Sequence, residues 1–217
     1  MTQRVVLFNG PPGCGKDTAV NAVLQASQVH SQPLAQYFWS FDRMSMPIKK
    51  AFAATVALPI DKWGNVDFWE KRKEETIPGF GVSYRQWQID FSERFMKPLY
   101  GEAIFGRLFV SRNKRQHKAG IILVPDCGFD IEYTTLSEAF GVENVLVVKI
   151  YRPGHDYSKD SRNYLKVGSD FISDEYNGGP STASNVRHVT NSGTQEEFEA
   201  KVLPCVKEWL EKNAAKP

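Results

Sequence analysis

The chain has few cysteines, little net charge and no long apolar run, and each absence excludes a class of protein. Its 217 residues carry three cysteines without a C-x-x-C pair and four histidines without metal-ligand spacing. These counts argue against a disulfide framework and a zinc site. The net charge of +2 excludes a uniformly basic nucleic-acid binder but leaves a local basic face open. No apolar run suits a signal peptide or approaches the ~18 residues of a membrane span. We expect a single cytoplasmic domain.

Short apolar runs alternate with helical patterns along the chain. Such alternation predicts an α/β fold with a mainly parallel sheet covered on both faces. A long, mostly helical stretch separates the second run from the third, and we expect it to be an insertion at one sheet edge. The predicted strands are Val5–Phe8, Gln36–Phe41, Gly120–Asp126, Asn144–Tyr151 and Val186–Thr190.

Two capping-box signatures predict helix starts. Ser83 and Gln86 precede a helix that Pro98 should end, and its aromatic face consists of Trp87, Phe91 and Phe95. Thr194 and Glu197 open a C-terminal helix with four apolar residues directed inward, Phe198, Val202, Val206 and Trp209. Pro204 lies inside that pattern and predicts a kink.

The stretch GPPGCGKDT nearly matches the phosphate-loop pattern G-x-x-x-x-G-K-[ST]. It follows an apolar strand and precedes an amphipathic helix, as the pattern requires. Glycines let successive backbone N–H groups turn toward phosphate oxygens, and the helix N-terminus adds positive potential. The lysine would reach the β- and γ-phosphates of a nucleotide. The predicted nucleotide-binding residues are Gly10, Pro11, Pro12, Gly13, Cys14, Gly15, Lys16, Asp17 and Thr18.

Asp17 stands where the pattern has Ser or Thr. A carboxylate can hold magnesium directly or through water, so Asp17 is a candidate metal residue, and Thr18 offers a hydroxyl one position later. The alternative is that Asp17 only complements the helix dipole. Cys14 is either a thiol made reactive by the helix N-terminus or a small residue that fits the turn.

Acidic and basic side chains follow the predicted strands, where ligands bind in open α/β sheets. Asp126 ends the third strand and is a candidate magnesium and catalytic residue. Asp42 follows the second strand as a candidate general base, or alternatively as a helix N-cap, and Arg43 beside it is a candidate acceptor-binding residue.

Cations near a phosphate loop can stabilise charge on a transferring phosphoryl group. Arg152 and Arg162 follow the fourth strand, in a predicted lid over about residues 152–166, and are candidate catalytic residues. Arg85 in the helical insertion is a candidate acceptor-binding residue. The basic run Arg112–Lys118 fits either a solvated helix end or a contact with a nucleic-acid backbone.

Several blocks resemble one family in the same order along the chain. GPPGCGKDT resembles the G-K-D-T loop of bacteriophage deoxynucleoside monophosphate kinases, and SYRQWQIDFSERF, PDCGFDIE, VKIYRPG and VTNSGTQEEF resemble later blocks of that group. The resemblance implies a P-loop, nucleoside monophosphate kinase-like fold with a five-stranded parallel sheet flanked by helices. It also implies ATP and Mg2+ as cofactors, with Asn191 and Gly193 lining the adenine pocket.

The chain departs from that family after the third strand. Gly128 stands where the D-x-R-F-x-x-E block has an arginine, which removes a cation from beside the acceptor. FSERFMKPLYGEAIFGR and KDSRNYL resemble a related phage branch that phosphorylates 5-hydroxymethyluracil in DNA. The expected acceptor is therefore a nucleotide or DNA. The alternatives are that hydroxymethyl group, a free deoxynucleoside monophosphate and, more remotely, none, in a nucleotide-binding switch.

These inferences together predict one P-loop kinase domain over residues 1–217. Its core would span residues 1–43 and 119–217, and its acceptor-binding helical insertion about residues 44–118. The predicted role is ATP-dependent phosphate transfer to a deoxypyrimidine.

Overall fold

The computed structural model divides the chain into two compact units. The first comprises Met1–Arg43 and Val110–Pro217, and the second Met44–Phe109. The structure describes residues 3–29, 33–55, 66–114, 120–158, 160–167 and 185–214. We call the two parts the sheet unit and the helical unit and describe each by itself.

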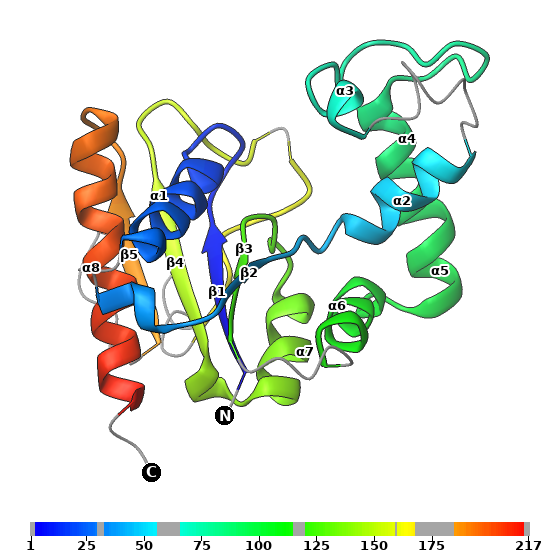
Figure 1. Cartoon of the computed structure of the whole chain (residues 1–217). Coiled ribbons are helices and arrows are strands. Elements are labelled where there is room, and N and C mark those ends of the chain that lie inside the picture. The colour runs from blue at the N-terminus through cyan, green and yellow to red at the C-terminus, as the bar shows by residue number, and fades with distance from the viewer. Residues whose placement is uncertain are drawn as a thin grey trace. The chain divides into compact units, whose positions relative to one another are not determined.

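The sheet unit contains five parallel strands in the order β2-β3-β1-β4-β5 (Figure 1). The predicted parallel α/β class is therefore confirmed. The first strand lies at the centre, so the loop that follows it opens at the middle of the carboxyl edge. The strands are β1 Arg4–Asn9, β2 Trp39–Phe41, β3 Ile121–Val124, β4 Val145–Tyr151 and β5 Val186–Thr190.

Both faces of the sheet are buried because alternate residues of each strand point to opposite sides. One face packs against α1 and α8 in a single core cluster, whose strand residues include Val6, Phe8 and Val148. The alternate residues Val5 and Leu7 are also fully buried, on the side that α7 covers (Figure 1). The helical segments of this unit are α1 Lys16–Gln28, α7 Asp130–Phe140 and α8 Gln195–Ala214, with short 3-10 turns η1 Pro33–Gln36 and η3 Val142–Asn144.

The capping box predicted at α8 is complete, whereas in the box predicted at Ser83 the Gln86 side chain donates to Asp90 instead of closing it. Thr194 Oγ1 accepts from the Glu197 N–H at 3.2 Å, and the Glu197 carboxylate accepts from the Thr194 N–H at 2.9 Å. The four predicted inward residues of α8 are all buried. At the other predicted box, Ser83 Oγ accepts from the Gln86 N–H at 3.1 Å. Local sequence therefore fixes both helix starts.

The helical unit has a small aromatic core made by Phe52, Trp69, Ile77 and Tyr84. Glu70 lies at its side, where its carboxylate pairs with Lys49 and Lys73 at 3.0 Å each. The unit contains α2 Met46–Thr55, α3 Val66–Glu70, α4 Tyr84–Asp90, the π-helix η2 Phe91–Met96 and α5 Lys97–Tyr100, and α6 Ile104–Lys114 runs from it into the sheet unit.

Two local predictions were wrong. The second strand begins at Trp39 instead of Gln36, because residues 33–36 form a 3-10 turn. Pro98 does not end its helix, which continues to Tyr100 and stops at Gly101 with φ 85°. The preceding turn is π-helical, and this wider turn leaves room for the proline ring. In the part of the chain described here, no helix is long and apolar enough to cross a membrane.

Candidate functional site

The loop between β1 and α1 has the backbone of an anion-binding turn. Gly13 and Gly15 have φ values of 75° and 112°, which favour glycine. The N–H of Cys14 is bonded to the Pro11 carbonyl at 3.2 Å, and α1 begins directly at Lys16. Because α1 follows β1 through this loop, the N-terminus of α1 lies at the carboxyl edge of the sheet.

Residues distant in sequence hold this loop in place. Asn191 Nδ2 donates to the Cys14 carbonyl at 2.9 Å, and Arg152 Nη1 donates to the Gly13 carbonyl at 2.8 Å. A Cβ at position 15 would lie 2.7 Å from Asn191 Nδ2. Asn191 is itself fixed, because its N–H donates to the Tyr151 carbonyl at 2.7 Å. Two predicted ligand residues, Arg152 and Asn191, thus contact the loop directly.

Lys16 bends back over its own loop. Its Nζ donates to the carbonyls of Gly10 at 2.5 Å and Pro11 at 2.7 Å. Burial lowers the pKa of Lys16, the nearby Cys14 thiol opposes that effect, and the charge of Arg162 lowers the pKa further. The negative charges of Asp17 and Asp160 offset part of this decrease.

Cys14 is packed and inert. It is fully buried, and burial raises its pKa despite the neighbouring Lys16 ammonium. A raised pKa leaves little thiolate, so the reactive-thiol interpretation is not supported. The side chain fills space at the base of the loop, where a Cβ on Gly10 would come within 2.6 Å of its Sγ.

Asp17 and Arg43 form an ion pair at the start of α1. The Asp17 carboxylate accepts from Arg43 Nη2 at 2.5 Å, and the Asp17 side chain is 68% exposed. Arg43 also stacks its guanidinium on Phe41, 5.0 Å from the ring centroid. The end of β2 is therefore tied to the phosphate loop, and Asp17 has a protein partner in addition to any metal.

Asp42 anchors the end of β2 to α6. Its Oδ2 accepts from Arg112 Nη2 at 3.0 Å and from Asn113 Nδ2 at 2.8 Å, while its Oδ1 accepts from the Arg43 N–H at 2.8 Å. The side-chain donors thus all bind Oδ2, whereas the hydrogen bond at Oδ1 comes from the backbone. Arg112 belongs to the basic run, of which residues 115–118 lie outside the described part.

Glu132, which follows β3, is a buried carboxyl group that no sequence pattern marked as functional. Glu132 accepts from the N–H groups of Gly128 at 3.2 Å and Phe129 at 3.4 Å. Burial raises the pKa of Glu132 to about 7, and the negative charge of Asp126 contributes to the increase. The negative charge of Asp126 thus acts on the buried Glu132 carboxyl. The capping position before α7 was the available signal for Glu132.

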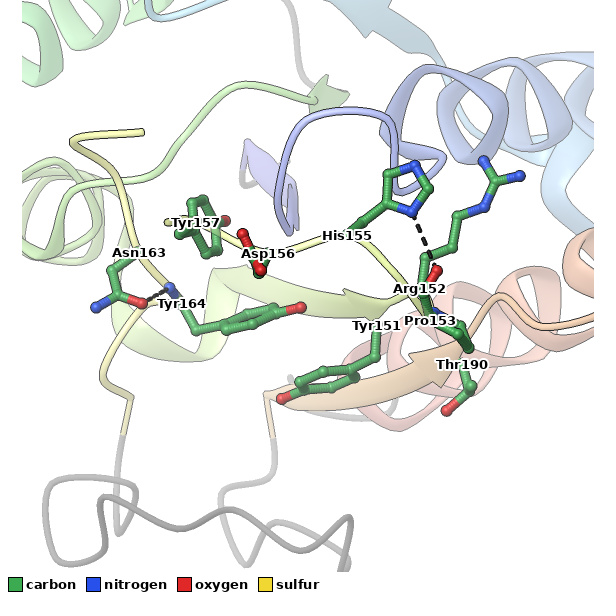
Figure 2. Close-up of a pocket in the computed structure, with 9 residues that line it drawn as sticks. All are labelled: Tyr151, Arg152, Pro153, His155, Asp156, Tyr157, Asn163, Tyr164 and Thr190. Carbon is green, nitrogen blue, oxygen red and sulfur yellow. Dashed lines mark hydrogen bonds between the residues drawn. The ribbon is translucent and has the colours of Figure 1, made fainter. Parts of the chain in front are cut away.

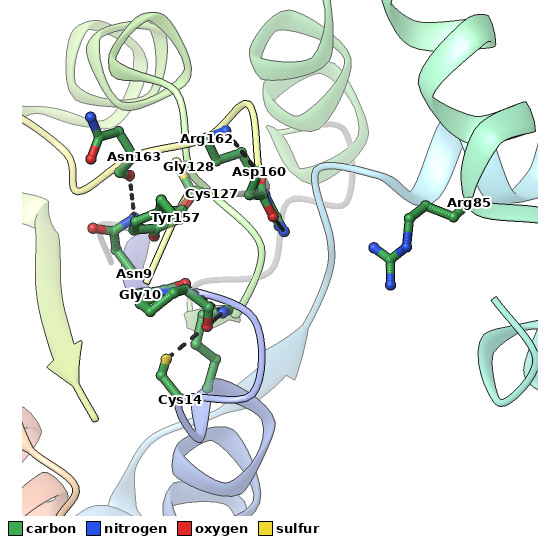
Figure 3. Close-up of polar contacts among 12 residues, drawn as sticks. Asn9, Gly10, Cys14, Arg85, Cys127, Gly128, Tyr157, Asp160, Arg162 and Asn163 are labelled. Carbon is green, nitrogen blue, oxygen red and sulfur yellow. Dashed lines mark hydrogen bonds and ion pairs between the residues drawn. The ribbon is translucent and has the colours of Figure 1, made fainter. Parts of the chain in front are cut away.

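Arg162 occupies the space that Gly128 leaves free (Figure 3). A Cβ at position 128 would lie 2.7–2.8 Å from the Cβ, Cγ and Cδ atoms of Arg162. The guanidinium is held by Asp160 through Nε at 2.8 Å and Nη2 at 2.5 Å. The aliphatic part of an arginine from another segment therefore covers position 128.

Asn9 connects β1 to the segment after β4, and sequence reasoning missed it. The side chain is fully buried. Its Nδ2 donates to the carbonyls of Cys127 and Asn163 at 3.2 Å each, and its Oδ1 accepts from the Leu165 N–H at 3.0 Å. A polar residue at the end of an apolar strand, next to the loop, was the only sequence signal. Asn163 and Leu165 are thereby held by hydrogen bonds at the end of the central strand β1 (Figure 3).

A cavity of about 480 Å³ lies at the carboxyl ends of β4 and β5 (Figure 2). Tyr151 and Tyr164 stack with centroids 4.7 Å apart, and Tyr157 meets Tyr164 edge-on. Tyrosine hydroxyls bond to the protein, that of Tyr164 to the Ile150 carbonyl at 3.1 Å. The lining residues are Tyr151, Arg152, Pro153, His155, Asp156, Tyr157, Asn163, Tyr164 and Thr190.

The remaining predicted residues lie as follows. Thr18 is in the first turn of α1. Gly193 precedes the Thr194 cap, where a side chain would collide with the Glu197 carboxylate. Arg85 belongs to the helical unit, where its Nε donates to Glu74. Lys159, inside the predicted lid, lies outside the described residues. No cluster of three metal-ligating side chains occurs in the described ranges.

Comparison with known proteins gives only distant similarities. No protein-family model matches the chain, and no curated protein matches it. Among solved structures, a gluconokinase from Sinorhizobium meliloti 1021 shares 11% identity with a TM-score of 0.46, over 97% of this chain and 95% of that chain. An unliganded sugar kinase from Janibacter sp. HTCC2649 shares 11% identity with a TM-score of 0.38, over 97% and 95% of the two chains. Similarities of this size carry no argument about chemistry, which rests on the chain's own residues.

Proposed function

We propose that the protein is a kinase that transfers the γ-phosphate of ATP to a deoxypyrimidine acceptor. The observation that carries the proposal is the loop after β1, with Gly13 and Gly15 in left-handed conformations and Lys16 directly at the start of α1. This arrangement of turned amides, helix N-terminus and lysine suits the phosphates of a nucleotide.

The cofactors would be ATP and Mg2+. The residues Gly10–Thr18 would surround the phosphates, and Asn191 and Gly193 would border adenine. Magnesium prefers oxygen ligands, takes one or two carboxylates and keeps phosphate and water ligands. Asp17 and Asp126 fit that requirement, because Asp17 is largely exposed at the first turn of α1.

Arg152 and Arg162 would offset the charge of the transferring phosphoryl group. The Arg152 guanidinium already lies against the loop, bonded to the Gly13 carbonyl. The charge of Arg162 acts on Lys16, whose pKa is lowered first by burial and also by this arginine. Arg152 therefore contacts the loop, and the charge of Arg162 acts on the lysine of that loop.

The first candidate acceptor is the hydroxymethyl group of 5-hydroxymethyldeoxyuridine in DNA, in a phage thymidine-hypermodification pathway. A base inside a duplex has to leave the stack before its oxygen can approach ATP in line. The phage resemblance and the absence of an arginine at position 128 support this acceptor. Arg43 and Arg85 would contribute to acceptor binding.

The second candidate acceptor is a free deoxynucleoside monophosphate, which would yield diphosphates for phage DNA synthesis. The position of Arg162 favours it, because its side chain crosses Gly128 and so places a cationic residue next to the position where the family has one. A phosphate acceptor needs such a cation. The glycine alone is therefore weaker support for a hydroxyl acceptor than the sequence suggests.

Labelled ATP distinguishes these candidates when it is offered with hydroxymethyluracil-containing DNA or with a panel of deoxynucleoside monophosphates. Label in DNA supports the first acceptor, and label only in free diphosphates refutes it. Label in neither, with ATP bound, supports a nucleotide-binding switch instead. The Lys16→Ala variant is the negative control, since transfer at the native rate in that variant would mean that ATP binds elsewhere.

The role of Asp42 is tested by the isosteric variant Asp42→Asn. If Asp42 is the general base, Asp42→Asn should lower kcat strongly and leave the free energy of unfolding unchanged. If Asp42 instead anchors β2 to α6, Asp42→Asn should lower the free energy of unfolding and change kcat little, because asparagine removes the charge that pairs with Arg112. Measuring both quantities on one variant assigns the role.

A further inference from the structure

The segments after β3 and β4 meet at Gly128, beside the end of β1 that leads into the phosphate loop. Gly128 follows β3, Arg162 and Asp160 follow β4, and Lys16 begins α1. Figure 3 shows the Asp160–Arg162 pair on the side of the loop marked by Gly10. The segment that carries Arg162 is fixed on both sides of the arginine, by Tyr157 and Asn163 contacts to the buried Asn9.

The Arg162 side chain has a defined path. Its aliphatic carbons lie against Gly128, at 2.7–2.8 Å from where a Cβ would stand. One carboxylate holds the guanidinium, because Asp160 accepts from both Nε and Nη2 of Arg162. Asp160 also accepts from the backbone N–H of Arg162 at 3.0 Å. The Asp160 side chain is only 12% exposed, so this fork-shaped pair is shielded from water.

The pair leaves one edge of the guanidinium available. Asp160 takes Nε and Nη2, while Nη1 makes no hydrogen bond to any of the described residues. The contact between Gly128 and Arg162 lies next to the phosphate loop, because Asn9, which directly precedes Gly10, donates to the carbonyls of Cys127 and Asn163 beside it. A fixed guanidinium with a free edge beside an ammonium suits an anion with several oxygens.

We propose that Asp160 and Gly128 are positioning residues that hold Arg162 as a phosphate-binding group beside Lys16. Asp160 orients the guanidinium, and the missing side chain at position 128 gives the arginine its path. Both residues act on the polyphosphate only through Arg162. The inference rests on the proposed function, because it assumes that the loop binds the phosphates of ATP.

The test is a pair of double-mutant cycles read out as affinity for inorganic tripolyphosphate, measured by calorimetry. Asp160→Ala and Gly128→Ala are each made in the native background and in an Arg162→Gly background. Glycine at position 162 is needed because the Arg162 Cβ itself lies 2.8 Å from the added Cβ. Each single variant should weaken binding about 10-fold, the value of one charge-assisted hydrogen bond. Both should have no further effect without Arg162.

Two further variants separate positioning from folding. Asp160→Asn keeps one oxygen acceptor and should lose less affinity than Asp160→Ala. Asp156→Ala is the matched control. Asp156 accepts from the Ser158 N–H at 2.9 Å, just as Asp160 accepts from the Arg162 N–H. The loss of tripolyphosphate affinity caused by Asp156→Ala should add to the loss caused by Arg162→Gly. The loss caused by Asp160→Ala should not add to it. Thermal unfolding without tripolyphosphate identifies any variant that has lost its fold.

The outcomes separate this inference from the proposed function. Equal losses in the native and Arg162→Gly backgrounds would overturn the positioning role, even if the protein transfers phosphate from ATP. Non-additive losses without any transfer from ATP would keep the positioning role and overturn the kinase. A native protein that does not bind tripolyphosphate would overturn both.

Discussion

The two units of this protein use charged side chains in different ways. In the helical unit, Glu70 is neutralised by two lysines and accepts from the Tyr84 hydroxyl at 3.1 Å. In the sheet unit, Lys16 bonds to two carbonyls and weakly to a thiol among the described residues. The charge of Glu70 is thus neutralised within its own unit, whereas the ammonium of Lys16 is bonded to neutral groups of its loop.

The two units also differ in the range of their contacts. The aromatic core of the helical unit joins residues from one continuous segment, Met44–Phe109. The loop in the sheet unit is held by residues such as Asn191, which lies 177 positions from Cys14. The predictions below test this contrast by matched changes in the two units.

The largest contrast is expected between Lys16→Ala and Arg85→Ala. Loss of Lys16 should lower kcat by about 10²–10³-fold, because a preorganised cation on the transferring phosphate is lost. Loss of Arg85, a proposed acceptor-binding residue, should raise the acceptor KM by about 10-fold and leave the KM for ATP unchanged. Steady-state kinetics with both substrates varied measure these effects. A KM for ATP that rises in Arg85→Ala would contradict the division of roles.

The next contrast is between Gly15→Ala and Gly81→Ala. Both glycines have positive φ, 112° and 71°, but only at position 15 would a Cβ meet a neighbour, Asn191 Nδ2. Gly15→Ala should cost about 3 kcal/mol through strain and collision, and Gly81→Ala about 1 kcal/mol through strain alone. Denaturant titration of each variant gives the values. Equal costs would show that the long-range contact at position 15 is unimportant.

Glu132→Gln and Glu70→Gln should have opposite pH signatures. Burial and the charge of Asp126 raise the pKa of Glu132 to about 7, from 4.5. Its contribution to stability is thus complete below pH 4.5 and is lost as the pH rises through 7. Glutamine, which needs no proton, should therefore stabilise the protein by about 1–3 kcal/mol at pH 8.

Glu70 behaves in the reverse sense. Burial alone would raise its pKa, but Lys49 and Lys73 together lower it below 4.5. Its contribution is present above pH 4.5 and is lost as the pH falls through the lowered pKa. Glu70→Gln should therefore cost about 1–3 kcal/mol at neutral pH and little at low pH. Unfolding free energies from pH 3 to 8 measure both variants, and slopes of the same sign would refute the assignment.

The smallest contrast is between the two helix caps. Thr194→Ala breaks a reciprocal capping box on α8, and Ser83→Ala removes one cap bond on α4. We expect costs of about 1 kcal/mol for Thr194 and somewhat less for Ser83. Hydrogen exchange at the first turn of each helix reports the local loss. Unchanged exchange in α8 would mean that packing alone fixes its start.

Much of the sheet unit could be predicted from sequence because its signals are local. Four-residue apolar runs, a Gly-rich loop and a capping box each specify one element through backbone preference. The second strand was misplaced because Gln36 to Phe38 are also compatible with a turn, and pairing with β3 decides where the strand begins. Pro98 was misread because the width of the preceding turn is not visible in sequence.

The candidate site was predictable only where it lies within one continuous segment. The sequence by itself determined the phosphate loop, since the glycines and Lys16 specify its turn and its charge over a few residues. Only the tertiary structure decided that Asn9 pins the segment after β4, that Asp42 is engaged by Arg112, and that Arg162 fills the space at Gly128. These contacts join residues 34 to 156 positions apart or fill a gap that no sequence pattern records. The physical reason is that packing between distant segments, unlike backbone preference, depends on the whole fold.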